Sequence, residues 1–306
     1  KAGVDASQVG EVFMGNVLSA NLGQAPARQA ALFAGLPNTV PCTTVNKVCS
    51  SGLKAVMLGA QSIMLGDNDV VVAGGMENMS MAPYFLEKAR FGYRMGPGKL
   101  QDHMVQDGLW DIVNDFHMGI SNDLCSEKYD ISREDQDRYA AESYRRTLQA
   151  INAGKFKDKI MPVEIPQRKG DPVIFDQDEC PRETSYEILA KMSPAFQKDG
   201  RATAGNASII SDGAAAVVVM AREKAEALGC SVIGLEVDPI YRDGETGEVY
   251  PQIVRKLHRE LGRALKKTFY EFSRSRTSFA PAHFLSLGRR TMVKAVWEVD
   301  EKLAEV

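Results

Sequence analysis

Apolar residues in the N-terminal part of the chain fall into short continuous runs around one longer apolar stretch, a pattern typical of α/β proteins. Residues 12–18 and 42–48 are rich in β-forming side chains, and residues 69–75 form an apolar run that ends in glycines, so each predicts a strand. Residues 51–65 are apolar almost all round, which predicts a helix buried on most sides. A shorter Ala-rich helix is predicted over residues 26–34. Strands and helices at this spacing predict a parallel sheet with right-handed crossovers.

The middle of the chain, residues 84–203, has a different pattern, because it is polar and interrupted by glycine and methionine. Its clearest element is a helix predicted over residues 132–152. Ser132 is a suitable N-cap, two acidic residues follow it in the first turn, and Gly154 can end the helix. We expect this stretch to be an excursion laid over the sheet.

The α/β pattern returns after the excursion. Residues 214–221 predict a strand, residues 222–228 a helix and residues 231–237 another strand. In residues 241–306 basic residues outnumber acidic ones, and the apolar spacing predicts a basic amphipathic helix. Such a helix can mark a membrane surface or a partner groove, but a surface helix that packs on its own domain is the simpler interpretation.

Composition narrows the class of protein. The 306 residues are 44% hydrophobic and 25% charged with a net charge of −3, the profile of an average soluble globular chain. Acidic and basic residues nearly balance, so the net charge does not indicate a surface that binds nucleic acid. No apolar run approaches the roughly 18 residues that a transmembrane helix needs. Neither nucleic acid nor a membrane is therefore an expected partner. The chain starts without a visible signal peptide or transit segment, so we expect a cytoplasmic or mitochondrial protein whose targeting signal is not visible.

The spacing of the cysteines and histidines argues against disulfide bonds and against a metal site. The five cysteines are an odd number with no CxxC pair, which favours neither a disulfide framework nor a zinc site. Reduced thiols in an intracellular compartment are the better interpretation. The four histidines also lack metal-ligand spacing, so no metal is expected. The Gly74–Gly75 pair could cradle a phosphate, but no dinucleotide or P-loop motif accompanies it.

One cysteine, Cys49, lies where the predicted strand 42–48 meets the predicted helix 51–65. Such a corner projects its residue at the carboxyl edge of a sheet, where α/β proteins bind ligands. The partial positive charge at the helix N-terminus favours a thiolate there, and the small neighbours of Cys49 leave room for a substrate. Catalysis is one interpretation; a small buried apolar side chain is the other, and it is the default for the remaining four cysteines.

Several long motifs resemble one enzyme family. The run NKVCSSGLKAVMLGAQSIMLGDNDVVVAGGMENMSMAPYF resembles the nucleophile region of thiolases, specifically the biosynthetic acetyl-CoA C-acetyltransferases. The resemblance continues through GQAPARQAAL, FHMG, ISREDQDRYAAES and TAGNASIISDGAAAVVVM, in that order, and covers residues 1–238.

The resemblance implies a thiolase-like, or condensing-enzyme, α/β fold. That fold has two similar βαβαβαββ halves with a loop domain inserted in the first. Residues 1–238 would be the N-terminal domain, with the loop domain at residues 84–203, and residues 239–306 would be a non-matching tail. The second half of the family carries Asn-Glu-Ala-Phe, Gly-His-Pro and Cys-x-Gly motifs, and none occurs in this sequence. We therefore expect the C-terminal half to be absent or replaced, with the tail as foreign sequence.

The resemblance also implies a reaction and a site. Two acetyl-CoA would condense to acetoacetyl-CoA plus CoA, with thiolysis as the reverse, and coenzyme A would be a substrate rather than a cofactor. Cys49 matches the nucleophile that carries the acyl group. The residues that match pantetheine contacts are Leu109, His117, Met118, Ala204 and Ser208. Family members are usually homodimers or homotetramers.

Two functional hypotheses remain open. The first is an active acyltransferase of the thiolase type. The second is a catalytically incomplete half-thiolase that binds acyl-CoA or forms a heteromer. A related ketoacyl synthase is less favoured, because those enzymes lack the NKVCSSG and FHMG contexts found here.

Overall fold

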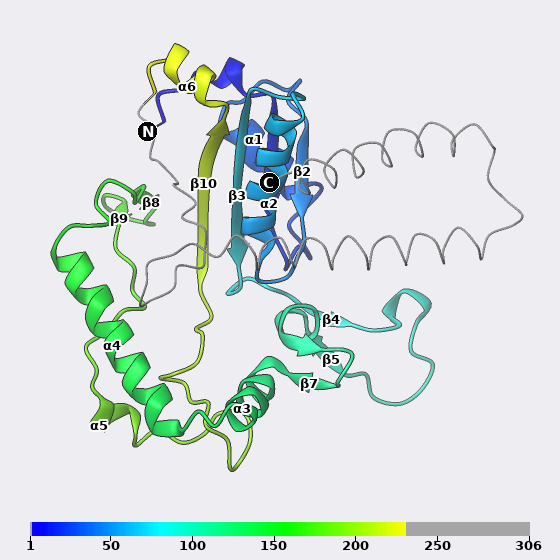
Figure 1. The fold of residues 1–306 in the computed structure, drawn as a ribbon. Coiled ribbons are helices and arrows are strands. Elements are labelled where there is room, and N and C mark those ends of the chain that lie inside the picture. Colours follow the sequence, from blue (N-terminus) through cyan, green and yellow to red (C-terminus); the bar gives the residue numbers. More distant parts are fainter. Residues whose placement is uncertain (1, 231–306) are drawn as a thin grey trace, which may run out of the picture. The chain divides into compact units, whose positions relative to one another are not determined.

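The computed structural model describes residues 2–230, and its centre is a four-stranded sheet with the strand order β10-β3-β1-β2 (Figure 1). The strands are β1 (Glu11–Gly15), β2 (Cys42–Val45), β3 (Val70–Asn78) and β10 (Asp212–Met220). β1 pairs in parallel with both β2 and β3, whereas β10 pairs antiparallel with β3. The strands predicted within the described residues are therefore confirmed, with shifted ends. The predicted strand 231–237 and the tail at 239–306 lie outside the described residues.

Two helices cover opposite faces of the sheet, and the alternation of side chains along β1 shows why. Val12 and Met14 pack with Ala27 and Ala31 of α1 (Pro26–Phe33) in one core cluster. Phe13, which lies between them, packs in a second cluster against α2 (Ser51–Met64). Successive residues of a strand point to opposite faces, so both faces of β1 are buried under helices. Both helices were predicted, and both are confirmed.

The expectation that the second helix is buried on most sides is wrong. The buried face of α2 consists of small residues: Ser51, Ala55, Gly59 and Ser62. Its large apolar side chains are instead exposed, Leu53 by 65% and Met64 by 84%. The small residues let the helix approach the sheet closely, because a Cβ added at Gly59 would lie 3.1 Å from Val71 Cγ1. Apolar composition alone could not reveal that the smallest residues face the sheet.

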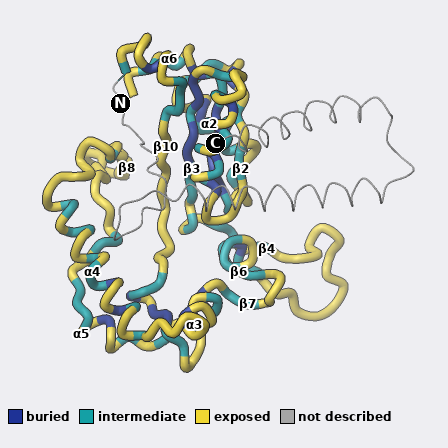
Figure 2. Tube along the Cα trace, viewed as in Figure 1, coloured by how far each residue is buried: buried dark blue, intermediate teal, exposed yellow. Residues whose placement is uncertain are grey.

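The chain between β3 and β10 forms small hairpins and two longer helices. The hairpins pair β4 (Tyr84–Leu86) with β5 (Leu100–Asp102), β6 (Trp110–Asp111) with β7 (Phe116–His117), and β8 (Val163–Ile165) with β9 (Val173–Phe175). The longer helices are α3 (Met118–Lys128) and α4 (Arg133–Asn152). The short elements in this stretch are α5 (Tyr186–Leu189), the 3-10 turn Ala89–Phe91 and the π-helical turn Met104–Leu109. Outside it, the 3-10 turn Ala6–Gln8 precedes β1, and α6 (Arg222–Ala227) follows β10. Within the sheet, buried residues are concentrated on β1 and β3, whereas β10 and the hairpins are mostly exposed (Figure 2).

The ends of α4 match their prediction. Ser132 is the N-cap, and its side chain accepts a hydrogen bond from the backbone N–H of Asp135 while the Asp135 carboxylate accepts one from the Ser132 N–H. This reciprocal capping box satisfies two backbone donors at the helix start. Gly154, just beyond the helix end, has a positive φ of 69°. None of the helices within residues 2–230 is long and apolar enough to cross a membrane.

Candidate active site

A tight turn connects β2 to α2 and carries the candidate nucleophile. Val48 in this turn has φ 51°, a left-handed conformation that β-branched residues rarely adopt. Side chains hold it there, because Asn46 Oδ1 accepts from the Val48 N–H at 3.0 Å and Ser51 Oγ donates to the Val48 carbonyl at 2.5 Å. Ser51 Oγ also accepts from the Lys47 N–H at 2.8 Å. The strain is therefore compensated by hydrogen bonds from both ends of the turn.

Cys49 follows Val48 and immediately precedes Ser50, the N-cap of α2. It is an exposed free thiol on the wall of a cavity of about 470 Å³. That cavity lies between the carboxyl ends of β1 and β3, the start of β10 and the Cys49 turn. The thiol is thus open to solvent at the edge of the sheet where α/β proteins bind ligands.

Glycines allow the N-terminus of α2 to sit directly on the strand ends. A Cβ added at Gly15 would lie 2.6 Å from the Ser51 carbonyl carbon and 2.7 Å from the Gly52 nitrogen. A Cβ at Gly75 would lie 3.5 Å from Gly52 Cα. The neighbouring Gly74 faces the backbone of β10, where an added Cβ would overlap the Ala215 carbonyl. The Gly74–Gly75 pair therefore serves close backbone packing around the cavity.

A carboxylate clamps the chain after β1 to the end of β3. Glu77 accepts hydrogen bonds from the Val17 N–H at 2.9 Å, the Leu18 N–H at 3.0 Å and Asn16 Nδ2 at 3.1 Å. Asn16 Nδ2 also donates to the Met76 carbonyl, which fixes the orientation of its amide. Asn16 Oδ1 is buried without a hydrogen-bond partner among the described residues. Asn16 and Glu77 both line the Cys49 cavity.

Neither Asn16 nor Glu77 was predicted as a site residue, although the position of Glu77 in the sequence carries a signal. Glu77 directly follows the buried apolar run of β3 at its carboxyl end. A charged residue in that place points at the ligand edge of a parallel sheet.

Leu109 is the one predicted pantetheine contact that the structure brings to the Cys49 cavity, where it lies beside Gly108 at the end of the π-helical turn. The buried His103 precedes this turn, with its Nδ1 2.6 Å from Asp107 Oδ2. Its Nε2 accepts from the Ala20 N–H at 3.4 Å, so the proton resides on Nδ1. This histidine joins the turn to the chain that follows β1.

The other four predicted contacts do not line this cavity. His117 is the N-cap of α3, where its Nδ1 accepts from the Gly119 N–H at 3.0 Å, and its ring stacks on Phe196 with centroids 4.8 Å apart. Burial lowers the pKa of His117, which favours the neutral ring that this cap requires. Met118 is 40% exposed, and Ala204 and Ser208 are also exposed.

Metal-ligating side chains do not cluster in the part of the chain that the structure describes. Within residues 2–230 there is no group of three or more His, Cys, Asp or Glu residues arranged to hold a metal ion. All five cysteines lie within those residues, and all are free.

Comparisons with known proteins agree with the fold. The family model for the thiolase N-terminal domain matches residues 1–223. An acetyl-CoA acetyltransferase of Pseudomonas aeruginosa is 57% identical over 234 residues, which are 76% of this chain and 60% of that protein. Acetyl-CoA acetyltransferase 2 of Arabidopsis thaliana is 56% identical over 235 residues, again 76% of this chain but 58% of that protein. A probable acetyl-CoA acyltransferase of Staphylococcus epidermidis is 49% identical over 269 residues, covering 86% of this chain and 67% of that protein.

A solved structure adds the same result in three dimensions. The crystal structure of the Bacillus anthracis acetyl-CoA acetyltransferase has a TM-score of 0.71 and 42% identity, and the match covers 75% of this chain and 58% of that one. The chain thus spans about 60% of the length of the acetyl-CoA acetyltransferases named above. On the family model and on identities near 57%, this chain belongs to the thiolase family.

Proposed function

We propose that this chain transfers an acetyl group through Cys49, as part of the condensation of two acetyl-CoA to acetoacetyl-CoA plus CoA and of the reverse thiolysis. The observation that carries the proposal is the position of Cys49: an exposed thiol at the end of a strand, before a helix N-terminus, on the wall of a cavity. The names of the relatives support acetyl-CoA as the substrate.

The first step forms one bond and breaks another. The Cys49 sulfur, as thiolate, attacks the carbonyl carbon of acetyl-CoA, and the coenzyme A thiolate leaves and takes up a proton. In the second step, the α-carbon of another acetyl-CoA releases a proton to the solvent, which balances the proton taken up by coenzyme A in the first step, and the resulting carbanion attacks the acyl carbon on Cys49. The Cys49 thiolate then leaves, and acetoacetyl-CoA is released. Coenzyme A is substrate and leaving group in both directions, so these steps use no cofactor.

We assign substrate contacts in two zones. Leu109 lies at the Cys49 cavity and would contact the end of the pantetheine arm next to the thioester. His117, Met118, Ala204 and Ser208 would contact the arm farther along, since they do not line that cavity. In this layout residues 1–238 are the thiolase N-terminal domain, residues 84–203 its loop domain and residues 239–306 a non-matching tail. By analogy with the family, the assembly would be a homodimer or a homotetramer.

The test is thiolysis of acetoacetyl-CoA by coenzyme A, followed by the loss of the acetoacetyl-CoA absorbance. The full chain should consume substrate, the Cys49→Ala variant should not, and the Cys125→Ala variant should match the unmodified chain. Cys125 is the matched control because it is also an exposed free cysteine. Acetylation of Cys49 without thiolysis would favour the alternative of a chain that binds acyl-CoA or completes a heteromer. No acetylation and no thiolysis would refute the proposal.

A further inference from the structure

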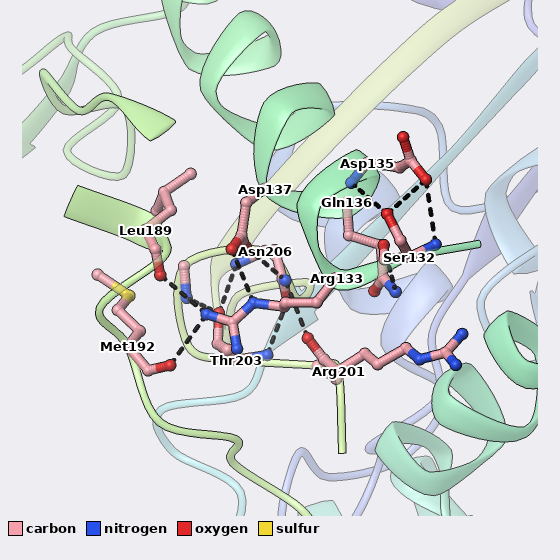
Figure 3. Close-up of polar contacts among 12 residues, drawn as sticks. Ser132, Arg133, Asp135, Gln136, Asp137, Leu189, Met192, Arg201, Thr203 and Asn206 are labelled. Carbon is pink, nitrogen blue, oxygen red and sulfur yellow. Dashed lines mark hydrogen bonds and ion pairs between the residues drawn. The ribbon is translucent and has the colours of Figure 1, made fainter. Parts of the chain in front are cut away.

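A carboxylate without a role in the proposed chemistry is buried on helix α4, whose buried residues are Asp137 and Ala140. Asp137 of α4 has 0% exposure. Its Oδ2 accepts from Arg133 Nε at 2.7 Å, and its Oδ1 accepts from Asn206 Nδ2 at 2.8 Å (Figure 3). Removing a carboxylate from water costs free energy unless it is paired and hydrogen-bonded. Arg133 and Asn206 supply that pairing for Asp137. Asn206 belongs to the segment that carries Ala204 and Ser208.

Asn206 in turn fixes the backbone of its own segment. Its Oδ1 accepts from the Thr203 N–H at 2.7 Å, and its Nδ2 also donates to the Arg201 carbonyl at 3.1 Å. Thr203 Oγ1 accepts from the Gly205 N–H at 3.2 Å. Gly205 is packed so tightly that an added Cβ would meet the Leu189 side chain. Hydrogen bonds within the segment therefore fix the conformation of this turn, and Ala204 is exposed on it.

The same segment is tied to α3. Asp123, a buried residue of that helix, accepts from the Arg201 N–H at 2.7 Å and from the Ala202 N–H at 2.9 Å. Helix α3 begins at Met118, directly after His117. Asp123 thus ties the residues just before Thr203 to α3, and Asp137 ties Asn206 to α4.

We infer that Asp137 is a positioning residue for coenzyme A binding: through Asn206 it holds the segment Thr203–Ser208 on α4, while Asp123 ties the two residues before that segment to α3. The inference rests on the proposed function only in the assignment of Ala204 and Ser208 to coenzyme A. Asp137 does not touch the substrate, because it is fully buried, and acts through the amide of Asn206. Its loss should therefore weaken coenzyme A binding while leaving the chemistry at Cys49 intact.

The bond between Asp137 and Asn206 can be broken and remade by exchanging donor and acceptor. Asp137→Asn places an amide NH2 group opposite a donor, either Asn206 Nδ2 or Arg133 Nε, and Asn206→Asp places two carboxylates opposite each other. The double exchange D137N/N206D places an amide donor opposite a carboxylate again and conserves the net charge, while the Arg201 carbonyl loses the donor that Asn206 Nδ2 provides. Asn206→Ala removes the bond to Asp137 together with those to the Thr203 N–H and the Arg201 carbonyl, so it tests the whole contribution of this amide. Glu142→Gln is the matched control, an acid-to-amide change in an exposed ion pair of the same helix.

The experiment measures coenzyme A affinity by calorimetry and Cys49 acetylation against acetyl-CoA concentration, on full chains whose folding is checked by thermal melting. The single exchanges and Asn206→Ala should raise the dissociation constant and the half-saturating acetyl-CoA concentration about tenfold or more, with the maximal acetylation rate within about twofold. The double exchange should restore part of the affinity that either single exchange loses, and Glu142→Gln should change neither value. Hydrogen exchange of the Thr203 and Gly205 amides should accelerate in the single variants only.

Failure of the inference differs from failure of the proposed function. If the unmodified chain is acetylated and folded Asn206→Ala binds coenzyme A as tightly, or if the double exchange restores stability but not affinity, Asp137 is merely structural. If the unmodified chain does not bind coenzyme A, the inference is also overturned. If the chain binds coenzyme A with the expected pattern among variants but Cys49 is never acetylated, the inference stands and the proposed acetyl transfer is wrong.

Discussion

Replacing Gly15 by alanine adds a single methyl group at the point where α2 rests on the end of β1. The added carbon would lie 2.6 Å from the Ser51 carbonyl carbon, 2.7 Å from the Gly52 nitrogen and 2.8 Å from Ser51 Cβ. Ordinary contact begins at 3.4 Å, so the start of α2 must retreat by about 0.8 Å. These atoms are backbone or Cβ atoms and cannot rotate away. Since Cys49 lies only two residues before Ser51, it must move with the helix.

Two effects follow from this displacement. Overpacking of this kind typically costs 1–3 kcal/mol of the free energy of unfolding, which corresponds to roughly 2–4 °C in Tm for each kcal/mol in a chain of this size. A displacement of about 1 Å at a reacting group can slow the reaction by up to about 100-fold. We therefore expect Gly15→Ala to lower both Tm and the rate of Cys49 acetylation.

Gly52→Ala is the matched control on the same cavity. Its added carbon would meet only the Gly74 carbonyl oxygen, at an ordinary 3.8 Å, and alanine favours the helix by up to about 1 kcal/mol. Calorimetric melting and quenched-flow acetylation of the two variants give both quantities. Equal acetylation rates for Gly15→Ala and the unmodified chain would refute the reasoning, as would an equal slowing by Gly52→Ala.

Three further outcomes test other parts of the structure. Val48→Gly should change the free energy of unfolding by no more than about 1 kcal/mol, because relief of the left-handed strain at Val48 offsets the conformational entropy that glycine adds to the unfolded chain. The same change should slow acetylation of Cys49, because it loosens the turn that carries the thiol. Urea melts measure the first effect and stopped-flow acetylation rates the second. Ser132→Ala should destabilise the chain by about 1 kcal/mol in urea melts through loss of the capping box, and no change would contradict the cap. Burial lowers the pKa of His117 in the folded chain, so the imidazole takes up a proton at a higher pH in the unfolded chain than in the folded one. The stabilising contribution of neutral His117 is therefore complete above about pH 6.5 and declines as the pH falls below that value. Urea midpoints between about pH 7.5 and about pH 5.5 should shift less in His117→Asn, which keeps a cap for Gly119 but does not titrate.

Local signals in the sequence predicted much of the fold. The apolar run of β3 and the capping residues of α4 act over a few positions, so the sequence contains the whole signal. Helix α3 was missed because MGISNDLCSEK has no apolar stripe; its N-cap is the unusual His117, and its buried positions include Gly119 and Asp123.

The orientation of α2 could not be predicted from its composition. Its buried face is chosen by how closely the helix can approach Gly15 and Val71, a property of the assembled sheet. The same limit applies to Glu77 and Asn16, whose hydrogen bonds join the ends of two strands far apart in sequence. Such long-range pairings appear only once the register of the sheet is set.

The candidate site was predicted unevenly for the same reason. The strand-to-helix corner places Cys49 by local geometry alone, and the structure agrees with an exposed position at the sheet edge. Leu109 lies at that cavity at the end of a turn whose preceding residue, His103, contacts the Ala20 N–H, and no local pattern encodes such a long-range contact.

The most direct measurement is peptide mapping by mass spectrometry after brief incubation of the full chain with acetyl-CoA and acid quenching. An acetyl group should appear on the peptide that contains Cys49 and disappear when excess coenzyme A is added before the quench. Acetyl groups on the Cys125 peptide instead, or on none of the five cysteines, would contradict the account.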